Sequence, residues 1–277
     1  RSKYCLAKRV IISVTNDLSN DQRLHRTAIT LKNAGFDVLL VGRKLPNSHP
    51  LAPQPYRTHR MWLMFKKGKF FYLEFNFRLF FFLLLRRVDY LNANDLDKIL
   101  ANFLVSRIRR KKLVYDSHEY FTEVPELVTR PAIRKVWLRL EEWVFPKLTS
   151  VMTVNQSIAD IYSKKYEKTV GVVRNLPLSK PFPDPSVKKT GVLMYQGALN
   201  LGRGIELMIQ AMVYLPQYTL VVCGKGDLQE ELKQLANELG MADRIVFKGL
   251  VPFHELHQLT LEAQLGFSLE EAIGENY

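Results

Sequence analysis

VLMYQGALNLGRGIELMIQAM (residues 192–212) begins the stretch that decides the fold, and YTLVVCGKGDLQEELKQLANELG (218–240) and RIVFKGLVPFHEL (244–256) continue it. In each segment a short apolar run ends at a glycine, and in the first two segments an amphipathic helical pattern follows. Strands that alternate with helices predict a parallel sheet with right-handed crossovers. Such sheets bind ligands at the edge where their strands end.

The turns after the first two strands combine glycines with a cation. They contain Gly197, Arg203 and Gly204 in the first turn, and Gly224, Lys225 and Gly226 in the second. Backbone N–H groups and the positive end of a helix at such a turn suit a phosphate group. The segment therefore predicts a phosphorylated ligand, of which a nucleotide conjugate is the first candidate.

The order of these motifs resembles the carboxyl-terminal domain of GT-B glycosyltransferases. G-x-L-x-x-x-R-G (from Gly197), then G-K-G-D (from Gly224), then G-x-V (from Gly249) is similar to family four, the retaining group that uses nucleotide-sugar donors. The resemblance implies an α/β fold with two Rossmann-like, doubly wound domains and an active site in the cleft between them. It also implies transfer of a sugar to an acceptor hydroxyl without a metal ion or other cofactor.

The resemblance also assigns donor-binding residues. Arg203 occupies the position of a lysine that binds the donor diphosphate, and we expect it to act in catalysis as a fixed cation. A second cation of the family is absent, because Ala198 stands in its place, and Lys225 is the candidate to replace it in part. Leu250 and Val251 begin the segment expected to select the base.

His118 is the second catalytic candidate, in the sequence V-Y-D-S-H-E at a strand end. In the resembled family a histidine after this strand faces the donor sugar. We expect a neutral imidazole, oriented by a neighbouring carboxylate, that hydrogen-bonds a sugar hydroxyl. The alternative is a loop histidine that satisfies backbone groups. Asp116 and Glu119 are expected to orient or support the site rather than to catalyse.

The turn after the first strand, T-N-D-L-S-N-D-Q-R (residues 15–23), lacks the glycine pair found in many relatives. We assign Asn16, Asp21 and Arg23 to the acceptor site. The alternative interpretation is structural: Asp21 caps the helix that follows, and Arg23 is solvated.

The upstream half of the chain also alternates strands and helices. Strands are predicted at Val10–Val14, Val38–Val41, Tyr90–Asn94, Leu113–Tyr115 and Ser150–Val154, and helices at Asp21–Asn33, Leu96–Arg109, Ile133–Val144 and Ser157–Tyr166, the last opened by a serine cap. Residues 176–190 contain four prolines without apolar periodicity and are predicted as a linker. This linker separates an amino-terminal domain (1–175) from a partial carboxyl-terminal domain (191–277). We expect a chain truncated before the family's donor-sugar glutamates.

The composition limits the kinds of binding partner and the location that we expect for this chain. The net charge of +13 favours an anionic partner, and the absence of RNP, zinc-finger and KH patterns makes nucleic acid the weakest option. Cys5 and Cys223 lie in apolar runs and predict buried, reduced thiols. No secretory signal is recognised at the start, so a cytoplasmic location is expected. His254 and His257 lack further metal-ligating neighbours, and no metal site is predicted.

FFYLEFNFRLFFFLLL (residues 70–85) is the most unusual local composition. It is too short and too polar to span a bilayer, yet lysines precede it and arginines follow. Two interpretations remain open: a core helix packed under the first sheet, or a surface that docks on an anionic membrane, where lipid-linked acceptors lie.

The predicted function is transfer of a sugar from a nucleotide-diphosphate donor to a glycan or lipid-linked acceptor, in surface polysaccharide synthesis. Two other classes of function remain. A non-hydrolysing sugar-nucleotide 2-epimerase shares the architecture but needs no acceptor. A truncated chain can instead serve as a non-catalytic nucleotide-binding or scaffold protein.

Overall fold

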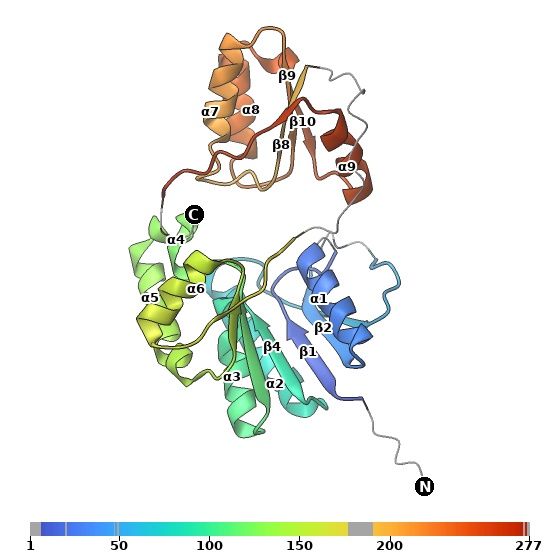
Figure 1. Ribbon diagram of the computed structural model, residues 1–277, viewed down its shortest axis with the longest axis vertical. Coiled ribbons are helices and arrows are strands. Elements are labelled where there is room, and N and C mark those ends of the chain that lie inside the picture. Colours follow the sequence, from blue (N-terminus) through green and yellow to red (C-terminus); the bar gives the residue numbers. More distant parts are fainter. Residues whose placement is uncertain are drawn as a thin grey trace. The chain divides into compact units, whose positions relative to one another are not determined.

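The computed structural model describes residues 7–176 and 191–275, apart from Asn20, Asn47, His49 and Gly274. The chain divides into two compact units after Leu176 (Figure 1). Apart from Leu176, the predicted linker lies outside the described residues, as does Cys5.

Seven parallel strands form the sheet of the amino-terminal unit. They are β1 (Arg9–Ser13), β2 (Asp37–Lys44), β3 (Arg57–Trp62), β4 (Tyr90–Asn94), β5 (Lys112–Ser117), β6 (Val151–Thr153) and β7 (Gly171–Val172). Their order is β3-β2-β1-β4-β5-β6-β7. The direction of winding reverses between β1 and β4, and the strand ends at this switch point are where doubly wound sheets bind ligands.

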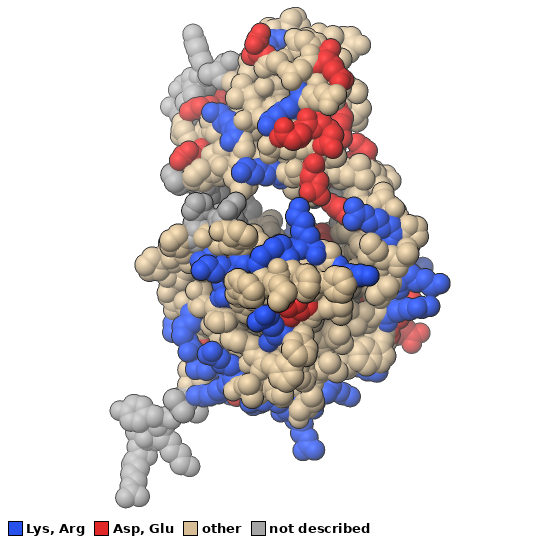
Figure 2. Space-filling view, turned by 180° about the vertical axis from the view of Figure 1, so that it is seen from behind, with Lys and Arg blue, Asp and Glu red and all other residues tan. Residues whose placement is uncertain are grey.

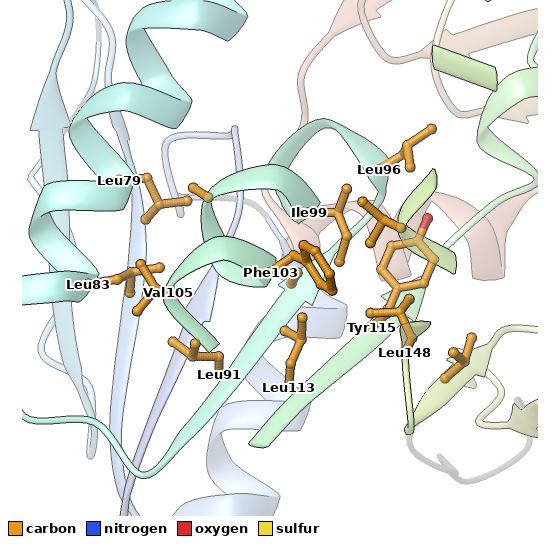
Figure 3. Close-up of a cluster of buried hydrophobic side chains, with 14 of the residues drawn as sticks. Leu79, Leu83, Leu91, Leu96, Ile99, Phe103, Val105, Leu113, Tyr115 and Leu148 are labelled. Carbon is orange, nitrogen blue, oxygen red and sulfur yellow. The ribbon is translucent and has the colours of Figure 1, made fainter. Parts of the chain in front are cut away.

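Helices cover both faces of this sheet. They are α1 (Gln22–Asn33), α2 (Gly68–Leu85), α3 (Ile99–Ile108), α4 (Pro125–Val128), α5 (Pro131–Val144) and α6 (Gln156–Tyr166), with 3-10 turns η1 (Leu96–Lys98), η2 (Phe121–Glu123) and η3 (Phe145–Lys147). α1 packs on one face, where Leu24 and Ala28 join an apolar cluster of β1 and β2. The larger core lies on the other face, where α2 and α3 cover the sheet; Figure 3 shows Leu83, Leu91 and Phe103 within it.

Side-chain caps set the start of two helices. Asp21 caps α1 by accepting a hydrogen bond from the Leu24 N–H (3.0 Å). Asn155 caps α6, because its Oδ1 accepts from the Ile158 N–H at 2.8 Å. The predicted serine cap of α6 is therefore wrong: Ser157 lies inside the helix, and the asparagine before it makes the capping bond.

Helix α2 buries one of its two apolar stripes. Phe71, Phe75, Leu79 and Leu83, spaced four residues apart, are buried in the core. Asn76 joins this side of the helix to the next chain segment: its amide donates to the Asp97 carbonyl (2.7 Å) and accepts from the Ala101 N–H (3.3 Å). The core-helix interpretation thus holds for this buried stripe.

The carboxyl-terminal unit has a four-stranded parallel sheet. Its strands β8 (Val192–Gln196), β9 (Thr219–Cys223), β10 (Ile245–Gly249) and β11 (Leu265–Gly266) lie in the order β10-β9-β8-β11. α7 (Ile205–Ala211) and α8 (Gln229–Glu238) pack on one face and α9 (Phe253–Glu262) on the other, with 3-10 turns η4 (Met212–Tyr214) and η5 (Ala242–Arg244). Cys223 is buried in β9. The predicted α/β fold with parallel sheets is confirmed.

Candidate active site

Three strand-end turns meet at one edge of the carboxyl-terminal sheet. The Gly197 N–H donates to the Cys223 carbonyl (3.0 Å), and the Gly224 N–H donates to the Gly249 carbonyl (2.8 Å). The Leu199 N–H donates to the Lys225 carbonyl (3.1 Å). The structure therefore brings together Gly197, Gly224, Lys225 and Gly226, four of the predicted donor-binding residues.

The glycines in these turns have a structural reason of their own. A Cβ atom on Gly224, whose φ is +149°, would lie 1.8 Å from the Gly197 carbonyl oxygen. A Cβ atom on Gly226 would lie 2.2 Å from the Leu199 carbonyl oxygen. Contacts this short exclude a side chain, so both glycines are required by the packing of one turn on the next. Their part in donor binding stays a prediction.

Arg203 and Gly204 lie beside the switch point of this sheet, between β8 and β11. Gly204 is the N-cap of α7 with φ +60°, and a Cβ atom there would lie 2.3 Å from the Leu269 carbonyl oxygen. The Arg203 Nη1 lies 3.3 Å from Oε1 of Glu270, in the segment after β11. Sequence reasoning missed Glu270, although it belongs to an acidic pair, Glu270 and Glu271, shortly after β11.

A pocket of about 410 Å³ opens beyond the end of β10. Its walls are formed by Lys248, Leu250, Val251, Pro252, Glu255, Gln258 and Leu259. Leu250 and Val251, which we predicted to select the base, therefore line a real hollow of mixed apolar and charged character. Base selection itself stays a prediction.

In the amino-terminal unit, His118 lies between two carboxylates just after β5. Its Nε2 is 3.2 Å from Asp116 Oδ2, and its Nδ1 is 3.6 Å from Asp95 Oδ2. Asp95 Oδ1 also accepts a hydrogen bond from the His118 backbone N–H at 2.7 Å. A carboxylate oxygen thus lies beside each ring nitrogen of His118, and the hydrogen bond to Asp95 Oδ1 fixes the backbone of the residue.

This setting changes the charge expected for His118. Burial favours the neutral ring, but Asp116 and Asp95 outweigh it and raise the pKa of His118. We predicted a neutral imidazole oriented by one carboxylate; the two carboxylates favour an imidazolium. Such a ring donates hydrogen bonds and cannot accept them.

Arg23 and Asp116 form a buried ion pair behind this histidine. The Arg23 Nη2 lies 2.6 Å from Asp116 Oδ1, and the two side chains are only 9% and 1% exposed. The alternative interpretation of Arg23 as solvated is wrong, because α1 directs it inward to the end of β5. The helix-cap interpretation of Asp21 holds, and Asn16 Nδ2 donates to Asp21 Oδ2 at 2.7 Å. The acceptor roles of Asn16, Asp21 and Arg23 stay predictions.

Sequence reasoning also missed the polar cluster at the β1–β4 switch point. Asp97 and Lys98 are buried as an ion pair (2.5 Å), and the Thr15 hydroxyl donates to Asp97 at 2.8 Å. Asp95 has φ +64°, a strained conformation for a residue other than glycine, and strain of this kind concentrates at functional sites. The signal was N-A-N-D-L-D-K, a charged run directly after a buried strand.

We predict that the stability of this unit falls as the pH rises from about 5 to 8. Burial, with Asp95 and Glu126 nearby, raises the pKa of Glu119 from its ordinary 4.5 to about 7. Over this pH range the folded chain holds a proton that the unfolded chain has already lost. The free energy of unfolding therefore falls with rising pH, by about 2 kcal/mol. The raised pKa of His118 acts in the same direction.

Urea unfolding at several pH values measures this dependence, and Glu119→Gln is the matched variant. Glutamine imitates the protonated carboxyl, so its stability curve is expected to be flatter. Parallel curves for the two proteins would assign the pH dependence to other groups.

Within the described residues, no group of three or more His, Cys, Asp or Glu side chains is arranged to hold a metal ion. The same part of the chain has no helix with both the length and the apolar composition to cross a bilayer.

Comparison with protein-family models identifies the chain. Residues 22–175, more than half of it, match the model Glycosyltransferase Family 4. The chain belongs to this family. Residues 179–270 match the model Glycosyl transferases group 1, and the fold is that of GT-B glycosyltransferases.

Two curated relatives are also glycosyltransferases by name. The chain is 24% identical to the putative glycosyltransferase EpsD of Bacillus subtilis, over 64% of this chain and 52% of that protein. It is 31% identical to the uncharacterized glycosyltransferase MJ1607 of Methanocaldococcus jannaschii, over 27% of this chain and 20% of that protein. The chain thus spans about half or less of the length of these relatives.

Solved structures share the fold of this family 4 chain. Sucrose-phosphate synthase from Thermosynechococcus elongatus has a TM-score of 0.71 at 15% identity, over 96% of this chain and 77% of that one. Anabaena HepE, solved in complex with UDP and glucose, has a TM-score of 0.67 at 15% identity, over 95% and 74%. WaaG, a glycosyltransferase involved in lipopolysaccharide biosynthesis, has a TM-score of 0.66 at 14% identity, over 94% of this chain and 75% of that one.

Proposed function

We propose that this protein transfers a sugar from a nucleotide-diphosphate donor to a glycan or lipid-linked acceptor, with retention of the anomeric configuration. The observation that carries the proposal is the edge of the carboxyl-terminal sheet. There Arg203, the start of α7 and the three glycine turns lie beside a switch point, with a pocket at the end of β10. HepE, which shares the fold, was solved with UDP and with UDP-glucose.

The chemistry follows from where charge develops. When the bond between the sugar and the diphosphate breaks, negative charge builds on the leaving phosphate. Arg203 and the amino-terminal end of α7 stabilise that charge electrostatically, without a metal ion. The acceptor hydroxyl approaches the sugar on the face from which the phosphate leaves, and the leaving phosphate accepts its proton. The acceptor oxygen bonds to that same face, which retains the configuration.

His118 is assigned to the donor sugar. The ring nitrogens of His118 face Asp95 and Asp116, which favour its protonated form, and a positive charge at this position suits a negative charge that develops on the substrate. Asn16, Asp21 and Arg23 are assigned to the acceptor side. We place the reaction in cytoplasmic synthesis of a surface polysaccharide, in line with the names of WaaG and of the lipopolysaccharide galactosyltransferase WaaB.

Calorimetric titration with UDP, GDP and ADP, each with and without magnesium, tests the donor site. We expect one nucleotide to bind, with equal affinity in the presence and absence of magnesium. Binding of none of them, or binding only with magnesium, would refute the metal-independent diphosphate site.

Product analysis separates the remaining functions. A 2-epimerase converts the nucleotide sugar without an acceptor, whereas a transferase releases the nucleoside diphosphate. A scaffold binds nucleotide without turnover of any donor. The anomeric configuration of the product, read by NMR, decides between retention and inversion.

A further inference from the structure

The second apolar stripe of α2 is exposed. Phe70, Leu73, Phe77, Phe81 and Leu85 follow one another at intervals of three or four residues and are 44–82% exposed. They lie on a different side of the helix from the buried stripe, so α2 is apolar on both sides. A helix that is apolar all round is normally buried on all sides.

The segment that links β3 to α2 extends this exposed stripe. Trp62, the last residue of β3, is 58% exposed, and Met64 and Phe65 in the link are 62% and 43% exposed. Between β3 and α2 lies a hollow of about 360 Å³, and Trp62, Phe77 and Phe81 are among its walls. β3 is the edge strand of the sheet, so this surface, which we call the α2 face, lies at the rim of the unit.

Cations surround the α2 face. Lys67 just before the helix and Lys69 in its first turn are exposed, as are Arg86 and Arg87 after its end. Arg78 lies 5.6 Å above the Trp62 ring and is paired with Glu74 at 2.8 Å. Aromatic rings flanked by Lys and Arg are the composition of surfaces that insert into the interface of an anionic bilayer.

The distribution of charge between the units points to the same partner. Residues 1–176 carry 32 Lys and Arg against 15 Asp and Glu, a net charge of +17, whereas residues 177–277 carry 8 against 12, a net charge of −4. The unit with the predicted diphosphate site is therefore not the one that holds the positive charge. Figure 2 shows basic side chains spread widely over the amino-terminal unit.

We propose that the α2 face docks this protein on an anionic lipid surface, with the exposed aromatic residues inserted among the lipids and the surrounding cations on the headgroups. Charge complementarity favours a bilayer over a second copy of the chain, since two faces on units of net charge +17 repel each other. The inference does not rest on the proposed function, because it requires neither a donor nor turnover.

Sedimentation with vesicles tests the proposal on the full chain. We expect binding to vesicles of equimolar phosphatidylcholine and phosphatidylglycerol, weaker binding at high salt, and little binding to phosphatidylcholine alone. Phe77→Ser/Phe81→Ser is expected to weaken binding about thirtyfold, because two exposed rings no longer enter the lipid. Lys67→Glu/Lys69→Glu is expected to weaken it about tenfold or more.

Val213→Ser/Tyr214→Ser is the matched control, since it removes two exposed apolar side chains from the other unit. It is expected to bind vesicles as the unchanged protein does, and all variants are expected to keep the same melting temperature. Equal binding by the Phe77/Phe81 variant, or equal binding to neutral vesicles, would overturn the proposal. So would a soluble dimer that the same variant dissociates, since the face would then serve self-association.

Discussion

Replacing Arg203 by alanine is expected to lower the rate of sugar transfer by about 10²–10³-fold. This is the size of effect seen when a fixed electrostatic group that stabilises developing negative charge is removed from an active site. Arg203 pairs with Glu270, in the segment after β11, at 3.3 Å. The measurement is release of nucleoside diphosphate from the donor.

Two variants make this result specific. Arg203→Lys is expected to keep much of the rate, because the resembled family usually has lysine at this position. Lys233→Ala removes an exposed cation of α8 in the same unit and is expected to change nothing. Unchanged turnover of Arg203→Ala would refute the assignment of this residue.

Arg23→Met is expected to lower the free energy of unfolding by about 3 kcal/mol. Removing one partner of a buried ion pair leaves the other charge without compensation, and Asp116 is only 1% exposed. The variant also loses the Arg23 hydrogen bond to the Val173 carbonyl (3.2 Å), which joins α1 to the segment after β7. Urea unfolding followed by circular dichroism measures the loss.

Lys32→Met is the control for this substitution, because it changes a solvent-exposed cation of the same helix. Its free energy of unfolding is expected to lie within about 0.5 kcal/mol of that of the unchanged protein. Adding Asp116→Asn to Arg23→Met is expected to recover part of the loss, since no uncompensated carboxylate then remains. Equal free energies of unfolding for Arg23→Met and Lys32→Met would mean that the buried ion pair contributes nothing to stability.

Much of the fold is predictable because strands buried on both faces leave a strong pattern. Tyr90–Asn94 was predicted with the bounds of β4, and Ile133–Val144 differs from α5 by two residues. β3 (Arg57–Trp62) was missed, because R-T-H-R-M-W at the edge of a sheet has neither a continuous apolar run nor a clean alternation.

The candidate site was less predictable than the fold, because its charges pair across long separations in sequence. His118 and Arg203 were singled out by their position after strands. The partner of Arg23 is 93 residues away, and the partner of Arg203 is 67 residues away. No local pattern distinguishes such a buried arginine from a solvated one, so only the packing of α1 against β5 reveals it.

The hydrogen bonds of Asn76 help to fix the rotation of α2 about its own axis. Because the stripe on the sheet and the stripe toward solvent are both Phe and Leu, burial of apolar area hardly distinguishes the observed helix from one turned about its own axis. The hydrogen bonds of Asn76 to the Asp97 carbonyl and the Ala101 N–H are made in only one of these settings. Asn76 acts together with Glu74, whose carboxylate accepts hydrogen bonds from the Met64 and Phe65 N–H groups, so that one set of aromatic rings faces the core and the other remains outside.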